Sequence, residues 1–295
     1  MMGVLFKHGV IIGGGLMGTS LALALRERGV CERLVMVDRE SSVLSLLRGM
    51  GMETCLMGDI AGVVGACDLV VLAVPVGCYG EVLRACASHL KGGALVTDVG
   101  SVKGCVMKEM ASSLPSSVSY VPSHPLAGTE NSGPMAADST LYQGRVCVVT
   151  PVALAPISAS DKKIMALWEA IGMDVLLMSS QDHDVLLAFS SHLPHVIAYA
   201  LTMCIRERGD EKGHDIERVS GGGLKDFTRI AASDSVMWRD IFLANRANVC
   251  SALRDFSRTL RALSTLIERG DGASIESTLS QLRHFKRSLD DKGGM

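Results

Sequence analysis

The sequence lacks the features that mark secreted, metal-binding and nucleic-acid-binding proteins. Its nine cysteines form no CxxC pair and show no regular spacing, which fits reduced cytosolic thiols better than a disulfide framework or a zinc site. Lysine and arginine are scattered in a chain of net charge −2, so no surface for nucleic acid is expected. Internal repeats and low-complexity tracts are also missing. The composition therefore predicts a globular, cytoplasmic protein that contains no metal.

Two apolar stretches look like targeting or membrane segments, but each carries residues that such a segment would lack. Residues 4–18 end in a glycine pattern that a cleaved signal peptide would not carry. Val185–Ile205 has no formal charge over a length that could span a bilayer. It also holds two histidines, two adjacent serines and a proline. We therefore expect a buried helix with polar side chains there, and no membrane contact.

A chain of 295 residues exceeds what one hydrophobic core usually spans, so two domains are expected. In the first half, short runs rich in β-branched residues alternate with stretches of helix length, which favours a mostly parallel α/β sheet of the Rossmann type. A helix at Asp161–Ile171 and a strand at Asp174–Met178 would close this domain, so we expect a dinucleotide-binding domain over residues 1–178. The predicted strands are Gly9–Ile12, Leu34–Val37, Leu69–Val74, Leu95–Thr97, Val118–Val121 and Val146–Thr150.

After Ser179 the strand signals vanish and apolar residues recur at helical spacing, which predicts an all-helical domain over residues 179–295. An intramolecular core and a dimer interface explain such apolar stripes equally well. One stripe comprises Val249, Leu253, Phe256, Leu260, Leu263 and Ile267, and the other comprises Ile275, Leu279, Leu282, Phe285 and Leu289.

A glycine pattern at the end of the first predicted strand indicates a dinucleotide site. Gly13, Gly15 and Gly18 form GxGxxG at the start of a predicted helix, Leu16–Arg28. The first glycine allows a tight turn, the second lets a pyrophosphate approach the backbone, and the third permits close helix packing. The amino end of the helix would then hold the phosphates.

The residues after the second predicted strand favour NAD over NADP. Asp38 stands twenty residues beyond Gly18, where a carboxylate can accept hydrogen bonds from the ribose hydroxyls. Arg39 follows and could pair with a 2′-phosphate, so use of NADP stays open. The predicted cofactor site comprises Gly13, Gly15, Leu16, Met17, Gly18, Asp38, Arg39 and Val74.

Candidate chemistry lies after the later strands, because ligands of open α/β sheets sit at the carboxyl ends of the strands. His124 follows one such strand, and histidine has the unperturbed pKa nearest neutrality, as a general base requires. Alone, a histidine beside a proline would as often be an ordinary loop residue. Further along, a glycine triplet leads into Lys225 and Arg229, which indicates either an anion-binding turn or a flexible loop with solvated charges.

Five stretches together resemble the prephenate/arogenate dehydrogenase family over nearly the whole chain. They are GGGLMGTSLA, DVGSVK, SHPLAGTENSG, SHLPH and GGGLKDFTRIAASDSVMWRDIF. The resemblance implies a nucleotide-binding domain followed by a helical dimerisation domain, hence a homodimer. It also implies NAD-dependent oxidative decarboxylation of a cyclohexadienyl acid, prephenate, to 4-hydroxyphenylpyruvate in tyrosine biosynthesis.

The same resemblance implies roles for particular residues. His124 would accept the proton of the ring hydroxyl, and Ser101 would orient that hydroxyl. Arg229 would bind a substrate carboxylate, with His195 as a second histidine in contact with substrate. The remaining members are two acidic residues of an ionic network with that arginine and a residue that lines the pocket, namely Glu130, Asp226 and Trp238.

Other functions remain open at this point. Arogenate differs from prephenate only in an amino group that replaces the keto group, so an arogenate or dual-substrate cyclohexadienyl dehydrogenase is the first alternative. A β-hydroxyacid dehydrogenase would need an asparagine four residues after its lysine, where this chain has Arg229 after Lys225. A non-catalytic NAD sensor would leave Ser101, His124 and Arg229 without a role.

Overall fold

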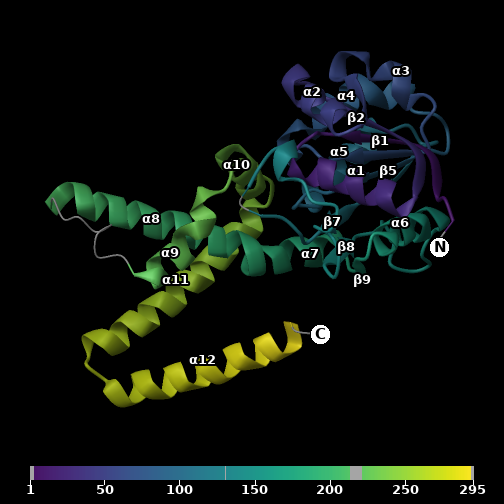
Figure 1. The fold of residues 1–295 in the computed structure, drawn as a ribbon. Coiled ribbons are helices and arrows are strands. Elements are labelled where there is room, and N and C mark those ends of the chain that lie inside the picture. Colours follow the sequence, from purple (N-terminus) through teal and green to yellow (C-terminus); the bar gives the residue numbers. More distant parts are fainter. Residues whose placement is uncertain (1–2, 130, 213–220, 294–295) are drawn as a thin grey trace. The chain divides into compact units, whose positions relative to one another are not determined.

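The computed structural model describes residues 3–129, 131–212 and 221–293. The chain divides into two compact units, Met1–Arg246 and Ala247–Met295. Figure 1 shows the elements of both units.

A parallel sheet forms the core of the first unit, as the alternating sequence pattern predicts. Its strand order is β3-β2-β1-β4-β5-β6, and every neighbouring pair is parallel. The order runs in opposite directions on the two sides of the β1–β4 pair, and this reversal creates the crevice in which such sheets bind ligands. The strands are β1 (Phe6–Ile12), β2 (Cys31–Asp38), β3 (Glu53–Leu56), β4 (Leu69–Leu72), β5 (Leu95–Asp98) and β6 (Ser119–Val121).

Helices cover both faces of this sheet because apolar side chains leave the strands on alternate sides. In β1, Ile11 belongs to one buried cluster, while Val10 and Ile12 belong to the other. The first cluster includes residues of α1 (Leu16–Arg28), α2 (Ser41–Gly49) and α6 (Ala159–Ala170). The second includes residues of α3 (Ala61–Val64), α4 (Tyr79–Cys86) and α5 (Gly104–Ser113). Short 3₁₀ turns are η1 (Met57–Asp59), η2 (Val76–Cys78), η3 (Ala87–His89) and η4 (Pro134–Ala136).

The later strands form a second sheet, which corrects the sequence-based expectation. The runs at 146–150 and 174–178 do form strands, but these pair with a short strand that the sequence did not predict, in the order β7-β8-β9. β6 ends before Pro122, which has no N–H to continue the ladder, and the Pro122 carbonyl accepts from the Thr150 N–H at 3.0 Å. The strands are β7 (Ser123–Pro125), β8 (Val146–Val149) and β9 (Asp174–Leu177).

The chain beyond β9 is helical wherever the structure describes it, as predicted. The Ser179 hydroxyl caps the helix Ser180–Leu187 by accepting from the Asp182 N–H at 3.0 Å. The Asp234 carboxylate caps the helix Ser235–Ala244 by accepting from the Met237 N–H at 2.7 Å. The helical elements of the first unit that follow β9 are α7 (Ser180–Leu187), the π-helix η5 (Ala188–His192), α8 (Leu193–Lys212), α9 (Gly222–Thr228), the 3₁₀ turn η7 (Arg229–Ala232) and α10 (Ser235–Ala244).

The apolar helix predicted to be buried is mostly uncovered in the single chain. Ser180–Gly209 is long and apolar enough to cross a membrane by length and composition, and only 28% of its most apolar window is buried. Its buried Asp184 side chain nevertheless forms hydrogen bonds within the first unit, accepting from the backbone N–H groups of Lys103 and Gly104. This helix therefore has one face fixed against the sheet domain and leaves other apolar side chains exposed, among them Phe189 and Met203.

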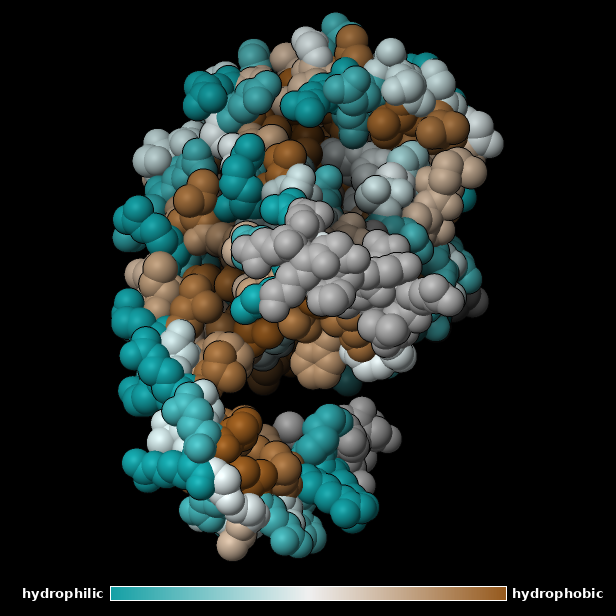
Figure 2. Space-filling model, turned by 90° about the vertical axis from the view of Figure 1, so that its left-hand side faces the viewer, coloured by the Kyte–Doolittle hydropathy of each residue, from teal (hydrophilic) through white to brown (hydrophobic). Residues whose placement is uncertain are grey.

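The second unit consists of two long helices, α11 (Arg246–Glu268), whose first residue belongs to the first unit, and α12 (Gly272–Gly293). Both carry the apolar stripes seen in the sequence. Several of these side chains are more than half exposed, including Leu260, Ile267 and Phe285, and Figure 2 shows apolar side chains at the surface. The single chain thus leaves much of both stripes uncovered.

Candidate active site

The glycine-rich loop after β1 leaves no space for side chains at two of its three motif positions. Gly13 has φ +112°, and a Cβ there would lie 2.4 Å from the carbonyl oxygen of Ala73. A Cβ on Gly18 would lie 2.0 Å from the Gly13 carbonyl oxygen. Gly15, at the amino end of α1, faces open space, with nothing within 4 Å of such a Cβ. The loop therefore has the tight turn, the close helix approach and the open backbone position that a pyrophosphate needs.

Asp38 lies beside this loop at the end of β2. Its carboxylate accepts from the Gly14 N–H at 2.7 Å and from the Glu40 N–H at 2.9 Å. Arg39 is exposed and pairs with the Glu40 carboxylate at 3.3 Å. Val74, after β4, lies on the other side of the loop, since its Cγ1 would be 3.0 Å from a Cβ on Gly13. The negative charge of Asp38 at this position fits an unphosphorylated ribose, as in NAD.

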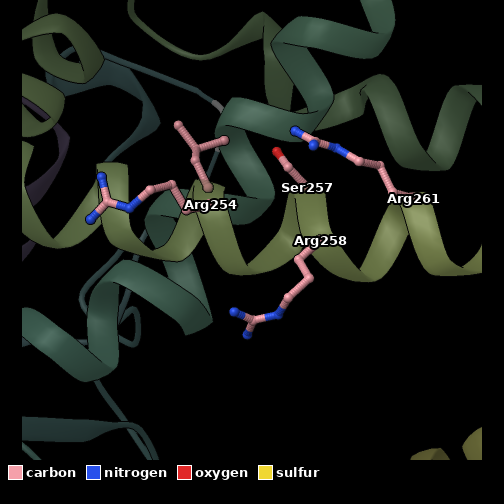
Figure 3. Close-up of a pocket in the computed structure, with 5 residues that line it drawn as sticks. Arg254, Ser257, Arg258 and Arg261 are labelled. Atoms are coloured by element: carbon pink, nitrogen blue, oxygen red, sulfur yellow. The ribbon is translucent and has the colours of Figure 1, made fainter.

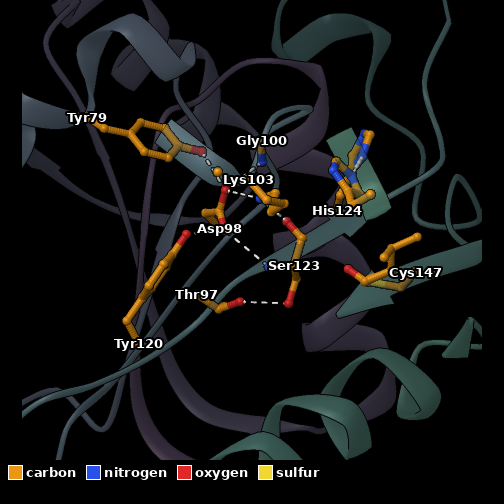
Figure 4. A network of polar contacts seen from close by, with 12 residues as sticks. Tyr79, Thr97, Asp98, Gly100, Lys103, Tyr120, Ser123, His124 and Cys147 are labelled. Atoms are coloured by element: carbon orange, nitrogen blue, oxygen red, sulfur yellow. Dashed lines mark hydrogen bonds and ion pairs between the residues drawn. The ribbon is translucent and has the colours of Figure 1, made fainter. Parts of the chain in front are cut away.

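A buried ion pair lies at the carboxyl end of β5. The Lys103 ammonium contacts the Asp98 carboxylate at 2.5 Å and donates to the Ser123 carbonyl at 2.6 Å, and the side chains of Lys103 and Asp98 are both fully buried. Figure 4 shows how the side chains around Asp98 converge. The pair ties the loop that follows β5, which contains Ser101, to the strand that contains His124.

The Asp98 carboxylate has further donors, so its burial is well compensated. The donors to its two oxygens are the hydroxyls of Tyr79 and Tyr120, the backbone N–H groups of Gly100 and Ser123, and the Lys103 ammonium. Burial and the Asp98 charge raise the pKa of both tyrosines well above the ordinary value, so both stay protonated as donors. This hub fixes the backbone on both sides of the predicted catalytic residues.

His124 lies on β7 and is joined to a buried carboxylate through a second histidine. Its Nδ1 is 2.8 Å from the Nε2 of His183, and the Nδ1 of His183 is 2.8 Å from the Oδ1 of Asp184. All three side chains are buried. The Asp184 carboxylate also accepts from the N–H groups of Lys103 and Gly104, at 2.9 and 2.8 Å. The three residues form one continuous polar chain between β7 and α7.

The surroundings of His124 keep its imidazole neutral. Burial, followed by the nearby His183, Lys103 and His192, lowers the pKa of His124 well below the ordinary histidine value. A neutral imidazole has an unprotonated nitrogen, which is what a proton acceptor requires. The site therefore provides a buried base next to a fixed cation.

Another buried histidine, His192, lies on the π-helix η5. It is fully buried, and its Nδ1 is 3.1 Å from the amide nitrogen of Asn245, which also donates to the Asp184 carbonyl at 2.7 Å. Burial lowers the pKa of His192 to about 4. The backbone of Ser101 lies against this ring, so the loop after β5 meets the helical part of the unit here.

The predicted substrate residues on the helices form a second group. The rings of His195 and Trp238 stack at 3.5 Å between centroids with an angle of 22°. Burial, and more weakly Arg229, lowers the pKa of His195, so Arg229 lies within electrostatic reach of that ring. Asp226 is exposed on α9, one turn before Arg229. The remaining predicted residue, Glu130, lies outside the described residues.

A separate pocket lies on α11 and includes none of the predicted cofactor, catalytic or substrate residues. It is lined by Leu253, Arg254, Ser257, Arg258 and Arg261. Figure 3 shows the Arg258 guanidinium on the opposite side of the helix, in this view, from those of Arg254 and Arg261. Arg258 also pairs with the Asp255 carboxylate at 2.8 Å.

Sequence reasoning missed the residues that support His124. His183, Asp184, Asn245 and the Lys103–Asp98 pair received no role. A signal was present, because Asp98 and Lys103 stand at the end of an apolar strand where charges are seldom buried without a partner. The adjacent pair His183-Asp184 before an uncharged helix is a similar signal.

Comparisons with known proteins give matches over both parts of the chain. The family model "Prephenate dehydrogenase, nucleotide-binding domain" matches residues 21–177, and "Prephenate dehydrogenase, dimerization domain" matches residues 179–281. A cyclohexadienyl dehydrogenase of Zymomonas mobilis is 39% identical, covering 96% of this chain and 94% of that protein. A prephenate dehydrogenase of Bacillus subtilis is 30% identical, over 98% of this chain and 76% of the relative.

Solved structures of a prephenate and an arogenate dehydrogenase are similar to nearly the whole chain. A prephenate dehydrogenase from A. aeolicus in complex with hydroxyphenyl propionate and NAD+ superposes with a TM-score of 0.89 at 32% identity, covering 96% of this chain and 98% of that one. An arogenate dehydrogenase from Synechocystis has a TM-score of 0.78 at 25% identity, covering 96% of this chain and 100% of the other. Similarity to both structures extends through the nucleotide-binding and helical parts.

Proposed function

Since this chain belongs to the prephenate dehydrogenase family, we propose that it oxidatively decarboxylates prephenate to 4-hydroxyphenylpyruvate with NAD, a step of tyrosine biosynthesis. The observation that carries the proposal is His124, a buried neutral base on β7. The Ser123 N–H on the same strand donates to Asp98, at the carboxyl end of β5, and the glycine loop follows the carboxyl end of β1 in the same parallel sheet as β5. A non-catalytic NAD sensor would not need such a base.

The residues around the loop fit NAD. Gly13, Gly15 and Gly18 would admit its pyrophosphate, and the Asp38 carboxylate would accept from its ribose hydroxyls. Bound NAD supplies the hydride acceptor of the reaction. The remaining members of the proposed cofactor site are Leu16, Met17, Arg39 and Val74.

The chain's own side chains would position the substrate and take its proton. His124 accepts the proton of the ring hydroxyl, Ser101 orients that hydroxyl, and Arg229 pairs with a carboxylate of the dianionic substrate. His195 and Trp238 line the ring, while Glu130 and Asp226 balance the charge of Arg229. Loss of carbon dioxide yields an aromatic ring, which makes the step effectively irreversible and leaves positioning as the main task of the protein.

The helical part would serve assembly as well as substrate binding. We propose domains at residues 1–178 and 179–295, with the second forming a homodimer in the cytoplasm. Exposed apolar side chains on α8, α11 and α12 support a dimer, because a second copy would remove them from water.

A dual-substrate cyclohexadienyl dehydrogenase is the second candidate. The specific observation in its favour is the Zymomonas mobilis relative with that name, which matches over 94% of its own length. Prephenate and arogenate share the ring and the ring carboxylate, so His124 and Arg229 would act identically on both.

The deciding experiment follows NADH formation by the purified protein with prephenate and with arogenate separately, each repeated with NADP. Turnover of prephenate with NAD is expected. Equal turnover of arogenate would favour the dual-substrate enzyme, and turnover of arogenate alone would exclude prephenate as the substrate. If neither acid reacts although NAD binds, the proposed reaction is wrong. Tests with 3-hydroxyisobutyrate and 6-phosphogluconate would then address the β-hydroxyacid alternative.

A further inference from the structure

We propose that His183 and Asp184 are positioning residues that hold the His124 imidazole in one tautomer, with the proton on Nδ1 and the lone pair on Nε2. The inference rests on the proposed role of His124 as the base. It assigns a role to a histidine and a carboxylate that the family resemblance does not use.

The donor and acceptor inventory of the chain leads to this assignment. A carboxylate can only accept, so His183 must donate its Nδ1–H to Asp184 across their 2.8 Å contact. Neutral His183 then has a lone pair on Nε2, and the 2.8 Å contact with His124 requires the Nδ1 of His124 to donate. The Nε2 of His124 is left unprotonated, and this is the nitrogen that can take a proton from a substrate.

The Asp184 carboxylate, at the end of the hydrogen-bonded series opposite His124, is held firmly enough to fix the proton positions on both histidines. Asp184 accepts from the backbone N–H groups of Lys103 and Gly104 as well as from His183, and these bonds keep the Asp184 pKa below its ordinary value. Because those N–H groups begin α5, the carboxylate cannot rotate away without losing them. The hydrogen-bonded series His124–His183–Asp184 therefore has a fixed ionised group at Asp184 and a reactive group at His124.

His183 must be neutral for the arrangement to work, and its burial favours that form. A doubly protonated His183 would donate from both nitrogens, which would force the His124 Nδ1 to accept and place the His124 proton on Nε2. Burial lowers the pKa of His183, and this effect exceeds the opposing influence of Asp184. Once His124 has taken up the substrate proton, its Nδ1–H still donates to His183, so the same contact stabilises the imidazolium. The logic is that of a serine-protease triad, with a histidine inserted between the base and the carboxylate.

Two substitutions of His183 separate positioning from mere packing. In His183→Gln the amide can accept from His124 through its oxygen and donate to Asp184 through its nitrogen, so most of kcat should be retained. In His183→Leu neither bond can form, and kcat should fall about 10²-fold, the lower range of what a general base contributes. The Kd for NADH should stay unchanged in both, because neither variant touches the glycine loop. Comparable loss of kcat in both variants would overturn the proposal.

A spectroscopic readout does not depend on turnover or on the stability of the variants. The ring ¹⁵N chemical shifts of the unliganded wild-type protein report which nitrogen of each neutral histidine carries the proton, and His124→Asn identifies the His124 signals among those of the eight histidines. We expect the Nδ1–H form for His124 in the wild type and in His183→Gln, and a shift toward Nε2–H in His183→Leu. An Nε2–H tautomer in the wild type would overturn the inference even if prephenate is turned over. An Nδ1–H tautomer without turnover would leave the arrangement intact and contradict the proposed reaction instead.

Discussion

The glycine loop and the histidine chain lie in the same unit but are built in different ways. The loop depends on backbone and on missing side chains within a short run of sequence, because Gly13 and Gly18 are positions where a Cβ would collide with backbone. The histidine chain depends on buried polar side chains brought together from β7 and α7, with Asp98 and Lys103 behind them. We expect loop variants to fail mainly through steric effects and variants around the histidines to fail mainly through electrostatic ones.

Removing the buried cation should have the largest effect on stability. Lys103→Met would leave the Asp98 carboxylate buried without its ion-pair partner, and breaking such a pair costs about 3–5 kcal/mol of unfolding free energy. Urea unfolding of the wild type and the variant measures the difference. Lys91→Met is the matched control, because Lys91 pairs with Asp68 at partly exposed positions, and surface pairs contribute only about 0–1 kcal/mol. Equal losses in the two variants would mean that the buried pair is not electrostatically special.

The buried histidines should make stability fall in mild acid. The folded pKa of His192 is about 4, below its unfolded value near 6.5, so the unfolded chain binds the proton first. Stability is therefore unaffected by this group above about pH 7 and decreases as the pH falls from about 6.5 to about 4, by about 3 kcal/mol in total. Below that range both states are protonated and the loss stops growing.

His192→Gln isolates this contribution. Glutamine can still accept from the Asn245 amide but does not titrate, so its unfolding free energy should decline less with pH than that of the wild type. His124, His183 and His195 also have lowered pKa values and remain in both proteins, which makes the difference between the two curves the relevant quantity. Parallel curves between pH 7 and pH 4 would show that His192 is protonated in the folded state or is not buried.

The same contrast explains what could be predicted from the sequence. GxGxxG and Asp38 lie in one local stretch whose spacing is dictated by a strand, a turn and a helix, so both fold and cofactor follow from it. β7 has only three residues, too few to give a periodic signal, and the later strands were therefore assigned to the wrong sheet. The link between His124 and His183 spans 59 positions and depends on how α7 meets β7. No local pattern encodes such a contact. The charged residues Asp98 and Lys103, at the end of a buried strand, indicated only that each needs a partner of opposite charge.

Two glycine variants test the glycine loop, for which we expect the smallest changes in the free energy of unfolding. Gly18→Ala would bring a Cβ to 2.0 Å from the Gly13 carbonyl oxygen, and the backbone shift should cost about 1–3 kcal/mol, as overpacking does. Gly15→Ala meets nothing within 4 Å at a φ of −76°, so the unfolding free energy should change by less than about 0.5 kcal/mol. Yet position 15 is where a pyrophosphate would approach the backbone, and the added methyl group would occupy that space. The Kd of the Gly15→Ala variant for NADH should therefore rise by about tenfold or more.

Titration of NADH fluorescence together with urea unfolding measures both quantities on the same samples. The expected result is a crossover, in which Gly18→Ala is the less stable variant while Gly15→Ala binds NADH weakly despite near-normal stability. That result would require the open face at Gly15 to be occupied by the cofactor, since none of the described residues would contact a Cβ at that position. If Gly15→Ala bound NADH as the wild type does, the dinucleotide would have to lie elsewhere, and the proposed position of His124 beside the hydride acceptor would lose its support.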